Sequence, residues 1–198
     1  AEIFDATLTE TAALFVVNPA EEMVAALIGV AGAYEGELPE IRLLGTERTI
    51  KKAFDDFLVA SNAAELTEQG TLSLRTGKLS HNTVLLTEET VYALVTTDQH
   101  AAALASDEAA FINAVETACQ HKWDRGDPYK LRTPSISRIR ETLEAEINEE
   151  IRTDFDRMLD TLETAEDVRG DRDEVTISLL VAAKNEVLLY DISRWGED

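Results

Sequence analysis

Short apolar runs alternate with longer segments of helical pattern along the first part of the chain. The run AALFVV at residues 12–17 ends at Asn18-Pro19 and predicts a buried strand. Residues 20–34 follow with a helical repeat, and two acids in its first turn suit the positive end of a helix dipole. By the same criteria we expect strands at 40–45, 71–75, 83–87, 91–96 and 101–105, one or two helices within 46–69, and a helix at 109–123. This order predicts an α/β domain over residues 1–127, with a partly parallel sheet flanked by helices.

Two prolines mark the end of this pattern. Pro128 and Pro134 bracket residues 128–134, and because residues that precede proline avoid helix, we predict an extended linker there. Residues 135–164 then place an apolar side chain at about every fourth position, which predicts one long helix with a single apolar stripe. Several successive steps of four residues distinguish it from the left-handed coiled coil, whose seam repeats at about 3.5 residues.

The apolar stripe of this helix needs a cover, because its other faces are charged. Either the stripe packs on its own domain, or it meets the same helix of a second chain. We expect the second arrangement, which would make the protein a homodimer. The residues expected at the dimer contact are Ile139, Leu143, Ile147, Ile151, Phe155, Leu159 and Leu162.

The segment at residues 174–198 has the pattern of two short helices joined by a tight turn. Apolar helical runs at 177–183 and 187–195 are separated by Lys184-Asn185-Glu186. A helix-turn-helix begins in this way, so we predict the first two helices of a winged helix-turn-helix. The third helix, which would read DNA, would have to follow Asp198, and we therefore expect a shortened chain. Lys184 and Arg194 are the basic residues of this segment and the candidates for contacts with DNA phosphates.

The net charge of the chain indicates the kind of cellular environment in which the protein works. It carries 39 acidic and 18 basic residues, a net charge of −21 and a pI near 4.4. Such a coat either repels DNA or belongs to a very salty cytoplasm, where ions screen the repulsion; we favour the second interpretation. No apolar run approaches the roughly 20 residues of a membrane span, and no signal-peptide pattern is present. A single cysteine, Cys119, excludes an internal disulfide, and we expect a soluble cytoplasmic protein.

Few residues suggest catalysis or metal binding. Cys119 and His121 form the one close pair of metal-binding type, and on a helix they would diverge, so we expect no metal and no cofactor. His81, Thr83 and Glu88 resemble the H-x-K-x-x-x-x-D motif of phospholipase-D-like domains. Thr83 replaces the lysine that grips phosphate, so the resemblance implies a degenerate, catalytically inert ligand site. Alternatively, His81 only begins a strand, or it serves as the nucleophile of a phosphodiesterase-like enzyme.

Three longer stretches resemble one protein family. They are VLLTEETVYALVTT at 84–97, PSISRIRETLEAE at 134–146 and DEVTISLLVAAKNEVLLYDISRWGED at 173–198, which are similar to haloarchaeal TbsP-type transcription regulators. This family is related in plan to TrmB-like regulators, which join a helix-turn-helix to an inert phospholipase-D-like sensor domain. The resemblance implies an α/β sensor domain, a long bridging helix and a winged helix-turn-helix that binds promoter DNA of metabolic genes. It leaves the identity of a small-molecule effector open, and the rival interpretation is a protein-interaction module that does not bind DNA.

Overall fold

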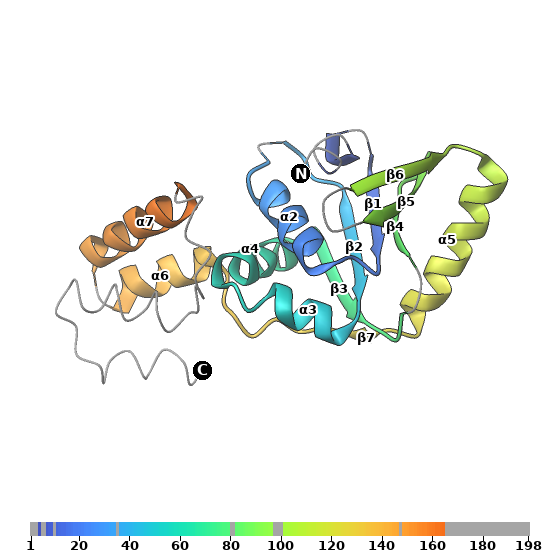
Figure 1. Cartoon of the computed structure of the whole chain (residues 1–198). Helices are drawn as coiled ribbons and strands as arrows, with labels where there is room; N and C mark the ends of the chain where they lie inside the picture. The colour runs from blue at the N-terminus through green and yellow to red at the C-terminus, as the bar shows by residue number, and fades with distance from the viewer. Residues whose placement is uncertain are drawn as a thin grey trace.

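A seven-stranded mixed sheet forms the centre of the larger domain in the computed structural model (Figure 1). The structure describes residues 4, 7–9, 11–34, 36–79, 82–96, 101–146 and 148–164. The strands lie in the order β6-β5-β4-β1-β2-β3-β7 across the sheet. They are β1 (Ala13–Val17), β2 (Glu40–Gly45), β3 (Leu72–Thr76), β4 (Thr83–Leu86), β5 (Val91–Thr96), β6 (Ala101–Ser106) and β7 (Asp127–Pro128).

Strands β1, β2 and β3 run parallel, and the remaining pairs are antiparallel. Parallel neighbours require a crossover connection, which helices supply. Helix α2 (Glu21–Gly32) joins β1 to β2, and α3 (Glu47–Ala53) and α4 (Phe57–Glu68) join β2 to β3. Strands β4, β5 and β6 follow one another as antiparallel neighbours. The mixed α/β architecture expected from the sequence is therefore confirmed.

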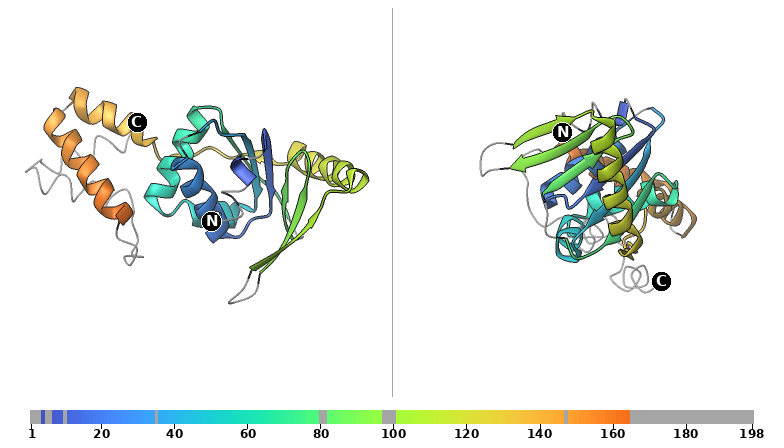
Figure 2. Two further views of the ribbon diagram at one scale, coloured as in Figure 1. Left: turned by 90° about the horizontal axis from the view of Figure 1, so that it is seen from above. Right: turned by 90° about the vertical axis from the view of Figure 1, so that its right-hand side faces the viewer.

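Helices cover both faces of the sheet at its centre (Figure 2). In β1, Leu14 and Val16 belong to the core beneath α2, α3 and α4. Phe15 and Val17 belong to the opposite core, beneath α5 (Ala109–Asp124). Burial on both faces explains why residues 12–17 form a continuous apolar run instead of alternating with polar residues. Trp123 of α5 meets Phe15 edge to face, with ring centroids 5.4 Å apart.

Arg75 of β3 fastens the carboxyl end of α5 to the sheet. Its guanidinium donates to the carbonyl oxygens of Trp123, at 2.8 Å, and Gly126, at 3.4 Å. The same group lies 4.9 Å from the centre of the Trp123 ring, a cation–π contact. The last carbonyls of a helix have no partner within it, so a cationic donor at this position satisfies them and suits the helix dipole.

The residues predicted as a linker are packed against the sheet. Asp127 and Pro128 pair antiparallel with β3 as the edge strand β7, and the backbone N–H of Tyr129 donates to the Leu74 carbonyl oxygen at 3.0 Å. Proline is tolerated at an edge because its missing N–H leaves no inner ladder bond unmade. Tyr129 and Leu131 are half-buried against the core. The sheet therefore extends into the connector, past the predicted end at residue 127.

The single helix predicted over residues 135–164 is wrong. Two helices occupy this range, α6 (Ile136–Glu146) and α7 (Glu149–Thr164); α6 lies beside α4, and α7 packs against α6 (Figure 1). Within the described ranges, no helix combines the length and apolar character needed to cross a lipid bilayer.

The contacts of Arg75 with the end of α5 should contribute measurably to the free energy of unfolding. Arg75→Ala should lower the free energy of unfolding by about 2 kcal/mol, because it removes charged hydrogen bonds and a cation–π contact. Urea unfolding followed by circular dichroism measures this loss. Arg48→Ala, at an exposed position of α3, is the matched control and should change stability by less than about 0.5 kcal/mol. Equal effects of the two substitutions would contradict the assignment.

Candidate functional site

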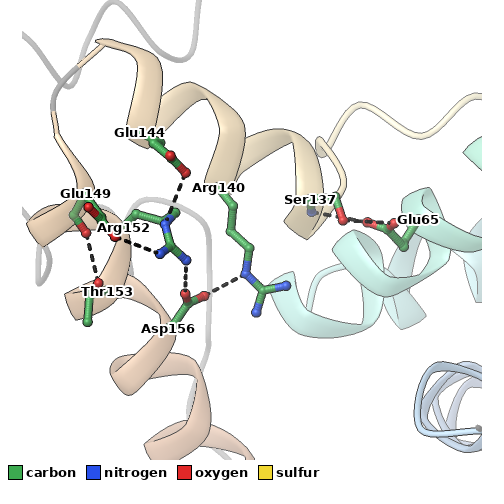
Figure 3. Close-up of polar contacts among 8 residues, drawn as sticks. All are labelled: Glu65, Ser137, Arg140, Glu144, Glu149, Arg152, Thr153 and Asp156. Atoms are coloured by element: carbon green, nitrogen blue, oxygen red, sulfur yellow. Dashed lines mark hydrogen bonds and ion pairs between the residues drawn. The ribbon is translucent and has the colours of Figure 1, made fainter.

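Ion pairs link helices α6 and α7, which form an antiparallel pair (Figure 3). Arg140 of α6 contacts Asp156 of α7 with 2.6 Å between nitrogen and oxygen. Arg152 of α7 lies 3.3 Å from Glu144 of α6 and 3.1 Å from Asp156. Asp156 thus joins two arginines, one from each helix. These side chains are partly exposed, so we expect a modest contribution to stability that salt reduces.

The break between α6 and α7 lies at Asn148. Its side-chain oxygen accepts from the backbone N–H of Ile151 at 2.9 Å, which caps the start of α7. Its own N–H donates to the Leu143 carbonyl oxygen at 3.1 Å. The apolar spacing continues across the break, which is why periodicity alone predicted one helix. A capping residue followed by Glu149 and Glu150 was the sequence signal that could have revealed it.

The apolar stripe packs within its own chain. Leu143, Ile151, Phe155 and Leu159 are buried in one cluster with Phe57 and Leu58 of α4, and Ile139 is half-buried against it. Of the two arrangements considered for the stripe, packing against its own chain and not against a second chain therefore applies to these residues. Their assignment to a dimer contact is corrected, because intramolecular contacts already cover them. Ile147 and the side chain of Leu162 lie outside the described residues.

Polar contacts join the first turn of α6 to the last turn of α4. Ser135 is fully buried, and its hydroxyl donates to Glu68 at 2.7 Å and accepts from the Arg138 N–H at 3.3 Å. The backbone N–H and the hydroxyl of Ser137 donate to Glu65 at 3.1 and 3.0 Å (Figure 3). Two carboxylates thus meet the positive end of α6, where the helix dipole favours them. At the carboxyl end of α4 itself the same charges are unfavourable, so the junction with α6 compensates for their position.

Most basic side chains described in α6 and α7 form ion pairs with Asp or Glu. Arg140 and Arg152 form the pairs described above, and Arg157 contacts Asp154 at 3.1 Å. Lys184 and Arg194, the candidates for phosphate contacts, lie outside the described residues. The described residues of α6 and α7 therefore do not form the basic stripe that contacts with a phosphate backbone require.

Thr83 and Glu88, two of the three predicted ligand residues, lie at opposite ends of β4. The Thr83 hydroxyl donates to the Asn18 carbonyl oxygen at 2.7 Å, at the start of the strand. Glu88 follows the strand, in the turn to β5, and accepts from the Thr11 hydroxyl. Burial raises the pKa of the Glu88 carboxyl, but hydrogen bonds from Thr11 and from nearby backbone N–H groups outweigh burial and lower it. His81, the third residue, lies outside the described residues.

Cys119 and His121 lie in different environments on α5. Cys119 is buried in the core beneath α5, and burial raises the pKa of its thiol, while Lys122 opposes this only in part. His121 is exposed. Across the part of the chain that the structure describes, no three ligand-type side chains converge to hold a metal ion.

Family models cover the chain from end to end. Residues 1–134 match the N-terminal model of "Transcriptional regulator TbsP-like", and residues 135–198 match its "C-terminal HTH domain" model. No curated protein matches the sequence. A solved structure described as TrmBL2, an archaeal chromatin protein with a novel mode of DNA binding, is similar with a TM-score of 0.46 and 11% identity. The match covers 65% of this chain and 50% of that one, so this chain spans about half its length.

The buried cap of α6 predicts a local loss of stability. Ser135→Ala should lower the free energy of unfolding by about 1–2 kcal/mol, because it removes the cap and leaves Glu68 without its donor. Ser73→Ala, at an exposed position of β3, is the matched control and should change stability by less than about 0.5 kcal/mol. Urea unfolding distinguishes the two, and a neutral Ser135→Ala would show that the junction contributes nothing.

The lowered pKa of Glu88 predicts a dependence on pH. A carboxyl whose pKa is lower in the folded state stabilises the fold above its unfolded pKa, near about 4.3, and this stability disappears as the pH falls through the folded pKa. Glu88→Gln should therefore flatten the acid side of a plot of stability against pH. Glu89→Gln, at the exposed neighbouring position, is the control, and identical acid limbs for both variants would refute the role of Thr11 as donor.

Proposed function

The chain belongs to the TbsP-like family of transcriptional regulators, and we propose that it binds promoter DNA through its C-terminal helix-turn-helix domain. The main support is the match of residues 135–198 to the helix-turn-helix model. Helix-turn-helix domains read base edges by placing a helix in the major groove, while basic side chains contact phosphates. We propose residues 174–198 as the first two helices of this reading unit, with Lys184 and Arg194 as phosphate contacts.

The α/β domain, in this proposal, is a sensor without catalytic activity. Its relation to phospholipase-D-like domains is proposed from the degenerate motif, in which Thr83 replaces lysine. A neutral hydroxyl donating to the Asn18 carbonyl cannot hold a phosphate as an ammonium group does, which supports the loss of catalysis. His81 and Thr83 remain the proposed contacts for a small-molecule effector, whereas Glu88, which β4 separates from Thr83, is no longer proposed to contact the same effector. An effector that prefers one arrangement of the domains would change DNA affinity by its difference in affinity for the two states.

The junction between α4 and α6 is the proposed path from sensor to DNA reader. It joins the two parts of the chain by buried apolar contacts around Phe57 and by the carboxylates of Glu65 and Glu68. A shift of α4 would move α6, because the bonds to Ser135 and Ser137 fix its first turn.

The proposed setting is the cytoplasm of a salt-loving archaeon, where the protein controls metabolic genes as a homodimer. The net charge of −21 supports the salty setting, since molar salt shortens the range of repulsion between protein and DNA to about 3 Å. Dimers of helix-turn-helix proteins bind paired half-sites, which supports two copies at one promoter.

Selection of genomic fragments tests DNA binding, with the full-length protein that includes the expected third helix after Asp198. In potassium chloride between about 0.2 and 2 M, one promoter sequence should be enriched and should bind more tightly than shuffled DNA by at least about a thousandfold. Lys184→Ala and Arg194→Ala should each weaken binding and reduce the slope of log affinity against log salt by about 0.9, because each removes one phosphate contact. Arg48→Ala, in α3, should leave both quantities unchanged.

Two outcomes would overturn the proposal. Failure to enrich any sequence over this salt range would remove DNA as the partner. Hydrolysis of a phosphodiester by the intact chain, abolished by His81→Ala, would show that the α/β domain is an enzyme.

A further inference from the structure

All three large apolar side chains that are exposed within the described ranges lie at one end of the sheet. Leu104 of β6 is 67% exposed, Val95 of β5 is 48% exposed and Phe111 of α5 is 47% exposed. The short connection Asp107-Glu108 places Phe111, in the first turn of α5, directly after β6. The remaining described surface exposes apolar side chains of this size nowhere else, so their grouping marks this end of the sheet as a contact surface.

Leu104 and Val95 lie on the face of the sheet that α5 covers elsewhere. Val91 belongs to the core beneath α5, and side chains at every second position of β5 share its face, which includes Val95. Leu104 pairs with Ala93 on the same face. Helix α5 packs over Val91 and Leu86 but leaves this outer part open. The apolar face therefore extends beyond the helix that shields it.

Among the described strands, β6 is an edge strand of the sheet, and it has no charged side chain. It is the terminal strand of the sheet, paired on one side with β5, and its sequence is AAALAS. Ala102 to Ala105 are exposed, on both faces of the strand. Edge strands usually carry lysine, proline or a bulge that prevents pairing with another chain, and β6 has none of these residues. The β5–β6 pair also extends past β4, whose pairing with β5 ends at Leu94 (Figure 2).

Charge favours a second copy of this chain as the occupant. The chain carries a net charge of −21, so a basic partner would bind its acidic surfaces and not this neutral strand. Two copies of this acidic chain repel each other, so a contact between them forms most readily where it brings no charged side chains together, and β6 with its apolar surroundings supplies such a surface. Identical strands paired antiparallel are related by a two-fold axis, which closes the assembly at two copies.

We propose that the protein forms a homodimer by antiparallel pairing of β6 with β6 of a second copy. The two sheets join into one continuous sheet, and both copies of α5 lie on the same face of it. Leu104, Val95 and Phe111 of the two copies then cover one another across the axis. This inference concerns assembly and does not depend on the DNA partner, so its failure and that of the DNA proposal are distinguishable.

Sedimentation equilibrium of the full chain, at potassium chloride concentrations from about 0.2 to 2 M, measures the mass of the species in solution and so tests the dimer. The expected species has twice the chain mass of 21.8 kDa, and its dissociation constant falls as salt screens the net charge. Leu104→Lys should raise this constant at least about tenfold, because it places two like charges across the axis. Ser73→Lys, at an exposed position of β3, is the matched control and should not change it. Both positions are exposed, so circular dichroism should report folded variants.

Disulfide cross-linking tests the same β6–β6 contact without a measurement of affinity. Mild oxidation should link Leu104→Cys into a covalent dimer, while Ser73→Cys, with the same number of thiols, stays monomeric; the buried Cys119 is common to both. A monomer at every salt and protein concentration would overturn the proposal. So would a dimer with unchanged affinity in Leu104→Lys, because it would place the interface on another surface.

Discussion

Burial of both faces of the sheet is the constraint from which the arrangement of this molecule follows. Strand β1 lies at its centre with apolar side chains on both sides, so helices must cover both faces. Helices α2, α3 and α4 cover one face as part of the parallel crossovers, and α5 returns over the other. Because α5 is the one described helix that covers that second face, the described part of the sheet is shielded at its centre and exposed at β6. The same constraint thus creates the core and the exposed edge.

The second requirement is to attach a helix pair to this core. Helix α4 serves both cores: residues such as Ala63 and Leu66 face the sheet, whereas Phe57 and Leu58 face α6 and α7. The attachment combines apolar area with capping of α6 by acids from α4. Apolar contacts stabilise without fixing direction, whereas hydrogen bonds to the first turn fix the axis of α6. Geometry at this junction therefore fixes the direction of α6, the helix at which the match to the helix-turn-helix model begins.

Most of the sheet domain could be predicted because its signals are local. The run at residues 12–17, the break at Asn18-Pro19 and the helical repeat that follows each reflect near neighbours in the sequence. The errors arose where distant residues decide. Pairing of Asp127 and Pro128 with β3 depends on an edge far back in the chain. The division at Asn148 was hidden because the apolar spacing, which follows contact with α4, continues through it.

The candidate sites show the same limit. The sequence led us to Thr83 and Glu88 by a motif, but it could not show that β4 separates them or that Asn18 and Thr11 supply their partners. The sequence pattern correctly predicted that the stripe with Leu143 and Ile151 is buried. We expected a second chain to bury it, whereas α4 of the same chain packs against it. Hydrophobic pattern specifies that a surface is covered, whereas the identity of the cover depends on tertiary geometry.

The position of Glu65 and Glu68 has a consequence for any attempt to divide the protein. A fragment that ends at residue 134, where the two family models meet, would keep both acids at the carboxyl end of α4 and remove the helix that compensates for them. It would also expose Phe57 and Leu58 to water. We therefore expect a fragment cut at this boundary to be less stable than the same residues in the whole chain.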